Sequence, residues 1–310
     1  MTLPLFLKKI IMKKFAFLAA GILAFSSVMA QSVANEEAAA LNAFLSEPSA
    51  NGNVTNGTVL GFDGSNLTAL EGVTVVNGHV TEIKWNNKGL GGALELADFP
   101  MLQKVNVAGN KLVSVDVSKA TNLKTLNVSS NELKALGVDS CMSLHSLYAS
   151  HNQLKSVFLQ GLSRLENLNL AFNKVDKLYL QDLPNLTSIV CNNNDMVDFG
   201  AVNCKALQEV NASYNNLTAT TFLNCPALES VSLQWNKIEE YTLKNQYQLQ
   251  RINLSNNNLR YVDLSNDEDL EYIDVTNNSD LSSLVVQGCN QLRQISAKFT
   301  DLNVAGSQVY

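Results

Sequence analysis

The chain has 310 residues, of which 46% are hydrophobic and 16% charged, and a formal net charge of −6. This composition is typical of a normal globular protein with one large or two ordinary domains. An acidic surface repels phosphate backbones, so the charge argues against a nucleic acid as partner.

Residues 1–30 have the pattern of an export signal. Lys13 and Lys14 form a positive segment, Phe15 to Phe25 an apolar one, and Val28-Met29-Ala30 a small-residue cleavage site. The alternative is a membrane anchor, but the apolar run is too short to span a bilayer comfortably. We therefore expect a secreted, periplasmic or cell-surface protein.

Two details of this segment affect the mature chain. Met12 is an alternative to Met1 as the start, because Met12 and the two lysines after it would begin a normal signal. No cysteine follows the apolar run, so a lipoprotein is not expected. Cleavage would remove four lysines and no acids, leaving 18 basic and 28 acidic residues and a net charge of −10.

Residues 31–79 are predicted to form an N-terminal cap that begins with a helix. Asn35 is a candidate N-cap, followed by two glutamates in the first turn. The apolar face comprises Ala38, Leu41, Phe44 and Leu45, and the helix is expected to stop at Ser46-Glu47-Pro48 and Asn51-Gly52. Further on, Asn77-Gly78 stands between alternating apolar residues, which predicts a β-hairpin over 73–83.

Residues 80–310 carry an internal repeat. A leucine recurs every 21 residues, at Leu102, Leu123, Leu144, Leu165, Leu186, Leu207, Leu228, Leu249 and Leu270; the flanking steps, from Val80 and to Leu292, are 22 residues. We number each repeat from this residue as position 1. Positions 1, 4, 6, 11, 14 and 16 are apolar and predicted to point inward, in two short strands on opposite sides of a flattened coil.

Position 9 is asparagine in nine successive repeats: Asn110, Asn131, Asn152, Asn173, Asn194, Asn215, Asn236, Asn257 and Asn278. An inward amide offers both donors and an acceptor, so it can satisfy buried backbone groups at a sharp turn. These residues are therefore predicted to be structural. The series ends at Lys88 on one side and at Thr300 on the other.

The pattern LxxLxLxxNxL followed by LxxLxL resembles the leucine-rich repeat. The resemblance implies a β-rich, right-handed solenoid of eleven repeats with the asparagine ladder of that family, stabilised by stacking of neighbouring coils. Because 21 residues are too few for a full helix in each coil, we expect strands on both sides and weak curvature, in a rod roughly 50 Å long.

The cap resembles that of plant-type repeat proteins, with a helix followed by GVTVxxGxVTEI, although their cysteine pair and tryptophan are absent. The overall arrangement is similar to secreted leucine-rich-repeat proteins of Bacteroidetes-type bacteria and, more distantly, to internalins. At the other end no polar helix covers the last coil. Either Val304, Val309 and Tyr310 fold over it, or another chain does, as in end-to-end self-association.

The five cysteines are interpreted first as core residues. Cys141, Cys204, Cys225 and Cys289 each lie three residues before the first leucine of the next repeat, position 19 of a 21-residue repeat, which is apolar in other repeats. Cys191 replaces a core leucine at position 6. A disulfide is an open alternative for Cys204 and Cys225, because equal positions in adjacent coils lie about 5 Å apart.

No catalytic, metal-binding or cofactor-binding pattern is present. The histidines His79, His145 and His151 lie at unrelated repeat positions, without metal-ligand spacing. The acidic run Asp267-Glu268-Asp269 is expected to be a solvated loop rather than a calcium site. We therefore expect a protein that is not an enzyme and that requires no cofactor or metal.

Aromatic residues gather at position 8. Down the stack it holds His151, Phe172, Asn193, Tyr214 and Trp235, with Phe299 further on, while Tyr148 and Tyr272 lie on the strand face itself. Polar residues surround them: Asn127, Asn169, Asn192, Asn211, Ser213, Ser232, Gln234 and Asn253. The column either shields the turns and rigidifies neighbouring coils, or forms an amphipathic ligand-binding platform. The second alternative is considered because tyrosine and tryptophan are typical interface anchors.

A protein ligand is our first hypothesis for the function of the chain, a glycan the second and self-association the third.

Overall fold

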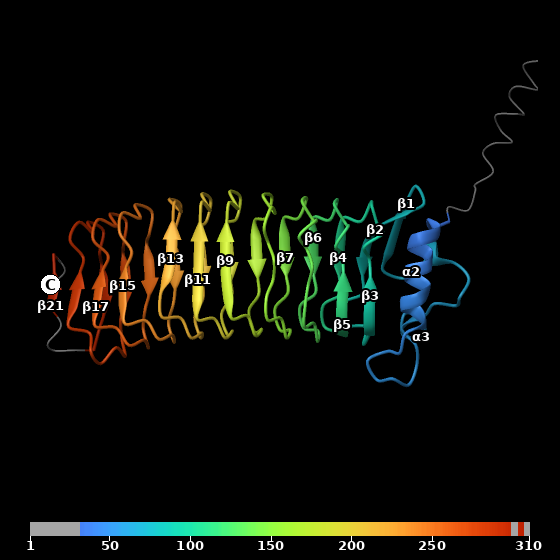
Figure 1. Ribbon diagram of the computed structural model, residues 1–310, viewed down its shortest axis with the longest axis horizontal. Helices are drawn as coiled ribbons and strands as arrows, with labels where there is room; N and C mark the ends of the chain where they lie inside the picture. The colour runs from blue at the N-terminus through green and yellow to red at the C-terminus, as the bar shows by residue number, and fades with distance from the viewer. Residues whose placement is uncertain (1–31, 299–302, 307–310) are drawn as a thin grey trace, which may run out of the picture.

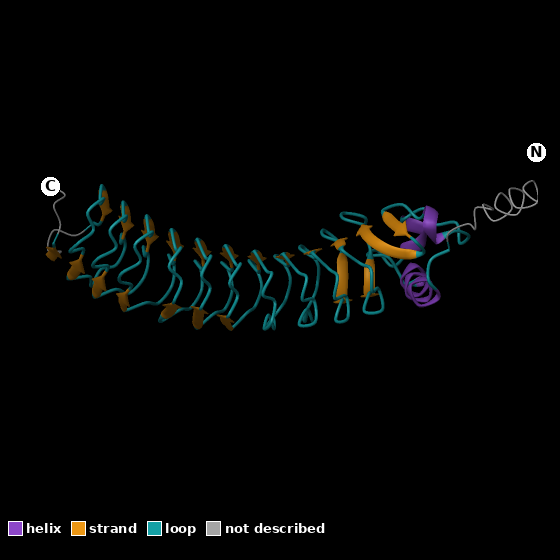
Figure 2. Ribbon diagram, turned by 90° about the horizontal axis from the view of Figure 1, so that it is seen from above, coloured by secondary structure: helices purple, strands orange, loops and turns teal. Residues whose placement is uncertain are grey.

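The chain forms a long, gently bowed rod made of stacked coils, capped at its N-terminal end by helices (Figures 1 and 2). The structure, a computed structural model, describes residues 32–298 and 303–306. The predicted signal segment, Phe299, Thr300, Val309 and Tyr310 lie outside these residues. The weak curvature expected from the short repeat is confirmed.

A twelve-stranded sheet follows the concave side of the rod, the upper edge in Figure 2. Eleven of its strands pair in parallel, one for each predicted repeat: β2 (His79–Lys84), β4 (Lys104–Asn106), β6 (Thr125–Asn127), β7 (Ser146–Tyr148), β8 (Asn167–Asn169), β10 (Ser188–Val190), β12 (Glu209–Asn211), β14 (Ser230–Ser232), β16 (Arg251–Asn253), β18 (Tyr272–Asp274) and β20 (Gln294–Ser296). The twelfth, β1 (Val73–Val76), pairs antiparallel with β2.

The convex side carries three shorter sheets. Their strands are β3 (Gly91–Glu95) and β5 (Lys111–Asp116); β9 (Lys177–Gln181), β11 (Asp198–Val202) and β13 (Thr220–Leu223); and β15 (Glu240–Thr242), β17 (Tyr261–Asp263), β19 (Ser283–Val285) and β21 (Asn303–Ala305). Single bridges from Asp116 to Gly137 and from Gly137 to Phe158 cross the region between the first two sheets. Strands on both sides are thus confirmed, although the convex side is interrupted.

The repeat fixes the register of the concave sheet. Leu126 pairs with Leu147, Leu147 with Leu168 and Leu168 with Ile189, so equal repeat positions stack in columns. These side chains are buried and join one continuous core along the rod. Since no coil can cover its own apolar side chains, neighbouring coils supply the burial that stabilises each.

The asparagines at position 9 form the predicted ladder. Asn194 is representative: its Nδ2 donates to the carbonyls of Cys191 in its own coil (3.1 Å) and Leu170 in the preceding coil (2.9 Å). Its Oδ1 accepts the backbone N–H of Val175 at 2.9 Å, also in the preceding coil. The ladder therefore joins each coil to the one before it, and its amides are not available to a ligand.

The adjacent residues Asn193 and Asn194 offer a test of this role. Replacing Asn194 with alanine leaves the buried N–H of Val175 without its acceptor, and should lower the free energy of unfolding by about 1–3 kcal/mol. Asn193 is part-exposed with a φ of 56°, so Asn193→Gly should change stability little. Chemical denaturation followed by circular dichroism compares the two variants, and equal losses would contradict the structural distinction.

The cap begins with helix α2 (Asn35–Ser46), followed by the short α3 (Asn56–Val59) and the 3-10 helix η1 (Leu67–Ala69). Asn35 is the first helical residue, not the predicted N-cap; Ala34 holds that place without a side-chain cap. The hairpin of β1 and β2 is confirmed, with Asn77 and Gly78 at positive φ in its turn.

A tryptophan does belong to the core of the cap. Trp85, from the first coil, is fully buried and stacks on Phe44 of α2, with ring centroids 5.6 Å apart. Its indole N–H donates to the carbonyl of Glu71 at 2.8 Å. Residues 31–79 themselves contain no tryptophan, so the one in the core of the cap comes from the first coil of the repeat.

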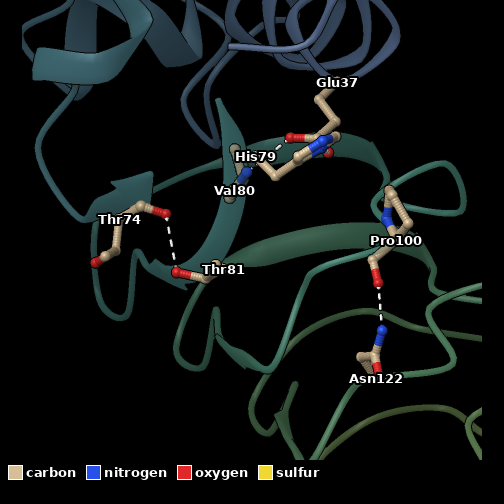
Figure 3. A network of polar contacts seen from close by, with 7 residues as sticks. All are labelled: Glu37, Thr74, His79, Val80, Thr81, Pro100 and Asn122. Carbon is tan, nitrogen blue, oxygen red and sulfur yellow. Dashed lines mark hydrogen bonds and ion pairs between the residues drawn. The ribbon is translucent and has the colours of Figure 1, made fainter. Parts of the chain in front are cut away.

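A buried carboxylate joins α2 to the hairpin (Figure 3). Glu37 is 1% exposed; its Oε1 lies 2.8 Å from His79 Nδ1, and its Oε2 accepts the backbone N–H of Val80 at 2.7 Å. Asn56 makes the corresponding link to the first coil, through bonds of 3.0 Å to both the N–H and the carbonyl of Gly91. His79 is therefore engaged in the cap.

Position 19 forms a buried column on the inside of the coils. Cys141, Cys204 and Cys225 are buried there as free thiols, and Cys289, the equivalent residue of a 22-residue repeat, is half-buried. Their Sγ atoms donate to backbone carbonyls, for example Cys141 to that of Val117 at 3.3 Å. The interpretation of these cysteines as core residues is confirmed, and burial raises the pKa of Cys141 and Cys289 to about 11.

Asp267 continues the same column, and the predicted solvated acidic run is therefore wrong for this residue. Its side chain is fully buried, while Glu268 and Asp269 are exposed. Oδ1 accepts the N–H of Gln246 at 2.8 Å, and Oδ2 has no hydrogen-bond partner. Burial raises its pKa to about 7, and the negative charge of Asp263 adds to the shift.

Candidate binding face

Position 8 is the turn that leaves each strand of the concave sheet, and its backbone is left-handed. From Ser130 to Trp235 the six residues at this position have φ between 54° and 58°. Each turn is held by the next coil: the N–H of Phe172 donates to the carbonyl of Asn192 at 3.0 Å, and that of Tyr214 to Gln234 at 2.9 Å. The turns therefore repeat without variation, whichever side chain they carry.

Four of five successive turns in this column carry ring side chains, in two stacked pairs. The rings of His151 and Phe172 are 4.3 Å apart and within 8° of parallel; those of Tyr214 and Trp235 are 5.7 Å apart and within 12°. Asn193 lies between the pairs. Phe172, Tyr214 and Trp235 remain 45%, 49% and 52% exposed. We call His151, Phe172, Asn193, Tyr214 and Trp235 the aromatic column.

Local backbone preference does not explain these residues. A left-handed conformation costs a residue with a Cβ roughly 1–2 kcal/mol, and glycine or asparagine adopts it most readily. The same position is accordingly Asn87, Gly109, Asn256 and Asn277 elsewhere in the rod. Each stacked pair contributes about 0.5–1.5 kcal/mol, which offsets only part of the cost of two turns. Stacking between the rings does not by itself account for the column.

Asparagines at position 5, expected to surround the aromatic column as polar contacts for a ligand, hold the ends of the strands instead. The Oδ1 atoms of Asn127, Asn169, Asn211 and Asn253 accept the backbone N–H two residues later, at 3.0–3.2 Å. These bonds fix the ends of the strands, so each of these four oxygens already accepts one backbone hydrogen bond, whereas Gln234 Oε1 beside the column has no partner. Tyr148 occupies the same position in β7 and is half-buried.

Tyr272 lies apart from the aromatic column. It is the first residue of β18, at the opposite end of the strands from position 8, and its neighbour is Arg251, whose guanidinium lies 5.4 Å from the ring centroid. A shallow depression of about 300 Å³ is lined there by Tyr272, Arg251, Asp274 and Gln294. Of the predicted site residues, the structure thus brings together the column but not Tyr272, and Phe299 lies outside the described chain.

The convex side holds two exposed aromatic residues that the sequence analysis did not single out. Phe158 is 75% exposed and Tyr179 is 62% exposed. They occupy the same repeat position in adjacent coils, so the signal was present in the register of the repeat. The sequence-based hypothesis covered only the concave strand face and therefore did not include these two residues.

Within residues 32–298 and 303–306, no group of three or more histidine, cysteine, aspartate or glutamate side chains is placed to hold a metal ion. In the same part of the chain, no helix has the length and apolar character needed to cross a membrane.

No family model and no curated protein matches the sequence. Solved structures do match. One is the functional domain of the internalin InlJ from Listeria monocytogenes, which includes a cysteine ladder: identity is 20%, the TM-score is 0.53, and the match covers 66% of this chain and 51% of that domain.

A second match is the leucine-rich-repeat ectodomain of the receptor kinase GASSHO1/SCHENGEN3 from Arabidopsis thaliana, solved with CASPARIAN STRIP INTEGRITY FACTOR 2. Identity is 18%, the TM-score is 0.60, and coverage is 86% of this chain and 41% of that one. The chain thus spans about half the length of the first structure and less of the second. Together with the 21-residue register and the asparagine ladder, these matches show that the chain has the fold of a leucine-rich-repeat solenoid.

Proposed function

We propose that this protein is an exported binding module, not an enzyme, and that it recognises a protein partner through the aromatic column on the concave side. The observation that carries the proposal is the placement of half-exposed aromatic rings on turns whose backbone favours asparagine or glycine. Rings held on a rigid backbone lose little conformational entropy on binding, which suits them to anchor an interface.

The fold supports the same function. A stacked solenoid offers an extended, pre-formed surface, and the plant ectodomain with a similar fold was solved in complex with a partner. Three of the column's rings are uncharged, so recognition would rest on apolar contact area more than on ion pairs. Tyr148, half-buried at the strand end, would extend the surface toward the sheet.

Affinity capture tests this proposal. The mature chain, residues 31–310, is immobilised and exposed to extracts and culture medium of its native host. A matched bait carries Tyr214→Asn and Trp235→Asn, both suited to the left-handed turn. A protein captured by the first bait and not by the second supports the proposal. Equal capture by both baits would exclude the aromatic column as the binding surface.

Export makes a separate prediction. If residues 1–30 are a signal peptide, the full chain expressed in a Gram-negative host should appear outside the cytoplasm with Gln31 as its first residue. N-terminal sequencing of the purified protein measures this directly. Retention in the cytoplasm with an intact N-terminus would contradict export, while leaving the binding proposal to its own test.

Two alternatives keep their own tests. Self-association through the last coil would give a concentration-dependent mass in light scattering, and a strict monomer would count against it. A glycan ligand on the concave face is tested on a glycan array; it has less support because two asparagine oxygens beside the column each already accept a backbone hydrogen bond.

A further inference from the structure

The convex side of the rod carries two exposed aromatic residues that are separate from the aromatic column of the concave face. Phe158 and Tyr179 stand at position 15 of adjacent coils. Among the large hydrophobic residues of the described chain, these two have the highest exposed fractions. The flanking residues in this column are Gly137, bridged to Phe158, and Gly200, paired with Tyr179. Two rings therefore project from a column whose neighbours on both sides have no side chain.

The two rings are held apart. A Cβ added to Gly200 would lie 3.4 Å from Cδ1 of Tyr179, so this ring leans over the glycine on the side away from Phe158. The Tyr179 hydroxyl donates to Asp198, in the same coil as Gly200, and fixes that orientation. Unlike the pairs of the aromatic column, Phe158 and Tyr179 do not stack on each other, and space remains between them.

A groove of about 500 Å³ occupies this space. Its polar side chains are Gln160, Gln181 and Asp182, and none of the residues that line it is cationic. The Asp182 carboxylate is positioned by two bonds, from Gln181 Nε2 at 3.0 Å and from Asn203 Nδ2 at 2.8 Å. The volume is within the range of small-ligand sites, roughly 300–1,000 Å³.

This combination matches the chemistry of a neutral sugar. A pyranose ring has apolar C–H faces that pack on exposed aromatic rings, and hydroxyl groups that bond to amides and carboxylates. The uncompensated carboxylate and the lack of a cation disfavour phosphate, sulfate and acidic sugars. We propose that this groove, which we call the convex groove, binds one or two units of a neutral oligosaccharide, with Phe158 and Tyr179 as platforms and Asp182 as hydroxyl acceptor.

The test uses the mature chain on an array of neutral and acidic glycans, followed by titration calorimetry with the oligosaccharide that binds best. Three variants are compared. Phe158→Thr/Tyr179→Thr introduces the residue found at the equivalent Thr221 and Thr242. Asp182→Asn keeps a residue suited to the left-handed turn, as at Asn203 and Asn224, and removes the charge. Tyr214→Asn/Trp235→Asn is the matched control on the other side.

Binding of neutral glycans is expected, weakened at least tenfold by the double threonine variant, severalfold by Asp182→Asn, and unchanged by the concave control. Binding of no glycan, or of acidic glycans alone, would overturn the proposal. So would a neutral glycan whose affinity depends on the concave residues. A protein partner lost from the threonine variant, with no glycan bound, would assign the groove to protein recognition instead. All these outcomes are distinct from the capture test of the concave face.

Discussion

Replacing Asp267 with asparagine is expected to stabilise the protein at neutral and alkaline pH and to remove a pH dependence that the wild-type chain shows. The wild-type carboxyl is fully buried, with one oxygen unpartnered, and its pKa is raised to about 7. In an unfolded chain an aspartate titrates near 3.9. The asparagine side chain keeps an oxygen for the N–H of Gln246 and carries no charge at any pH.

The direction of the effect follows from proton binding. Between about pH 4 and pH 7 the unfolded chain carries Asp267 ionised, while the folded chain keeps it protonated. The folded state binds more protons in that window, so the free energy of unfolding falls as the pH rises. The folded and unfolded pKa values of Asp267 differ by about three, which corresponds to at most about 4 kcal/mol of the free energy of unfolding. All of this stabilisation is lost above pH 7.

Asp263 changes the free energy of unfolding with pH in the opposite direction, and it does so in a lower pH range. Burial alone would raise its pKa, but hydrogen bonds from Lys244 and Ser265 lower it to about 2, so its stabilisation is lost only as the pH falls below about 4. The difference between wild type and Asp267→Asn in denaturant unfolding at pH 5.0 and 7.5 therefore reports on Asp267. Asp269→Asn, in the same acidic run but exposed, is the control and should match the wild type. Parallel curves for wild type and Asp267→Asn would contradict the argument.

The fold could be predicted almost entirely from the sequence because one spacing determines it. A leucine every 21 residues fixes the stacking of Leu126, Leu147 and Leu168, and an inward asparagine fixes the turns between them. Single residues that break the pattern without changing its register could not be placed in the same way. Asp267 reads as part of an acidic loop, yet the repeat position that it occupies is inside the coil.

The site was less accessible to prediction, for a physical reason. The aromatic column is visible as a pattern at position 8, but its left-handed backbone is not, and that backbone is what makes the rings at Phe172 and Trp235 unexpected. Similarly, the asparagines at position 5 look like free surface amides until their bonds to the strand ends are seen. Phe158 projects beside Gly137, which belongs to another coil, and only the register of the repeat places the two next to each other.

Substituting Tyr214 and Trp235 together with asparagine should weaken binding of a captured protein partner at least a hundredfold and leave stability nearly unchanged. Central aromatic anchors of an interface contribute about 2 kcal/mol or more each, and 1.4 kcal/mol corresponds to a tenfold change in Kd. Asparagine relieves a left-handed cost of roughly 1–2 kcal/mol at each of the two turns. The lost stacked pair costs about 0.5–1.5 kcal/mol, and the lost burial of two half-exposed rings costs about 1.5–3 kcal/mol. These terms nearly cancel, so the free energy of unfolding should change by less than about 1 kcal/mol.

The control for this variant is Asn277→Gly, at the same left-handed position but beyond the aromatic stretch, which should leave the Kd unaltered. Surface plasmon resonance with the captured partner gives the affinities, and denaturant unfolding gives the stabilities. If the double variant binds as the wild type does but is less stable by several kcal/mol, the rings serve the stacking of the coils. If it is stable but fails to bind, the rings form a ligand-binding surface at repeat positions that belong neither to the core nor to the asparagine ladder. The choice between those two roles is thus made by one pair of measurements on one variant.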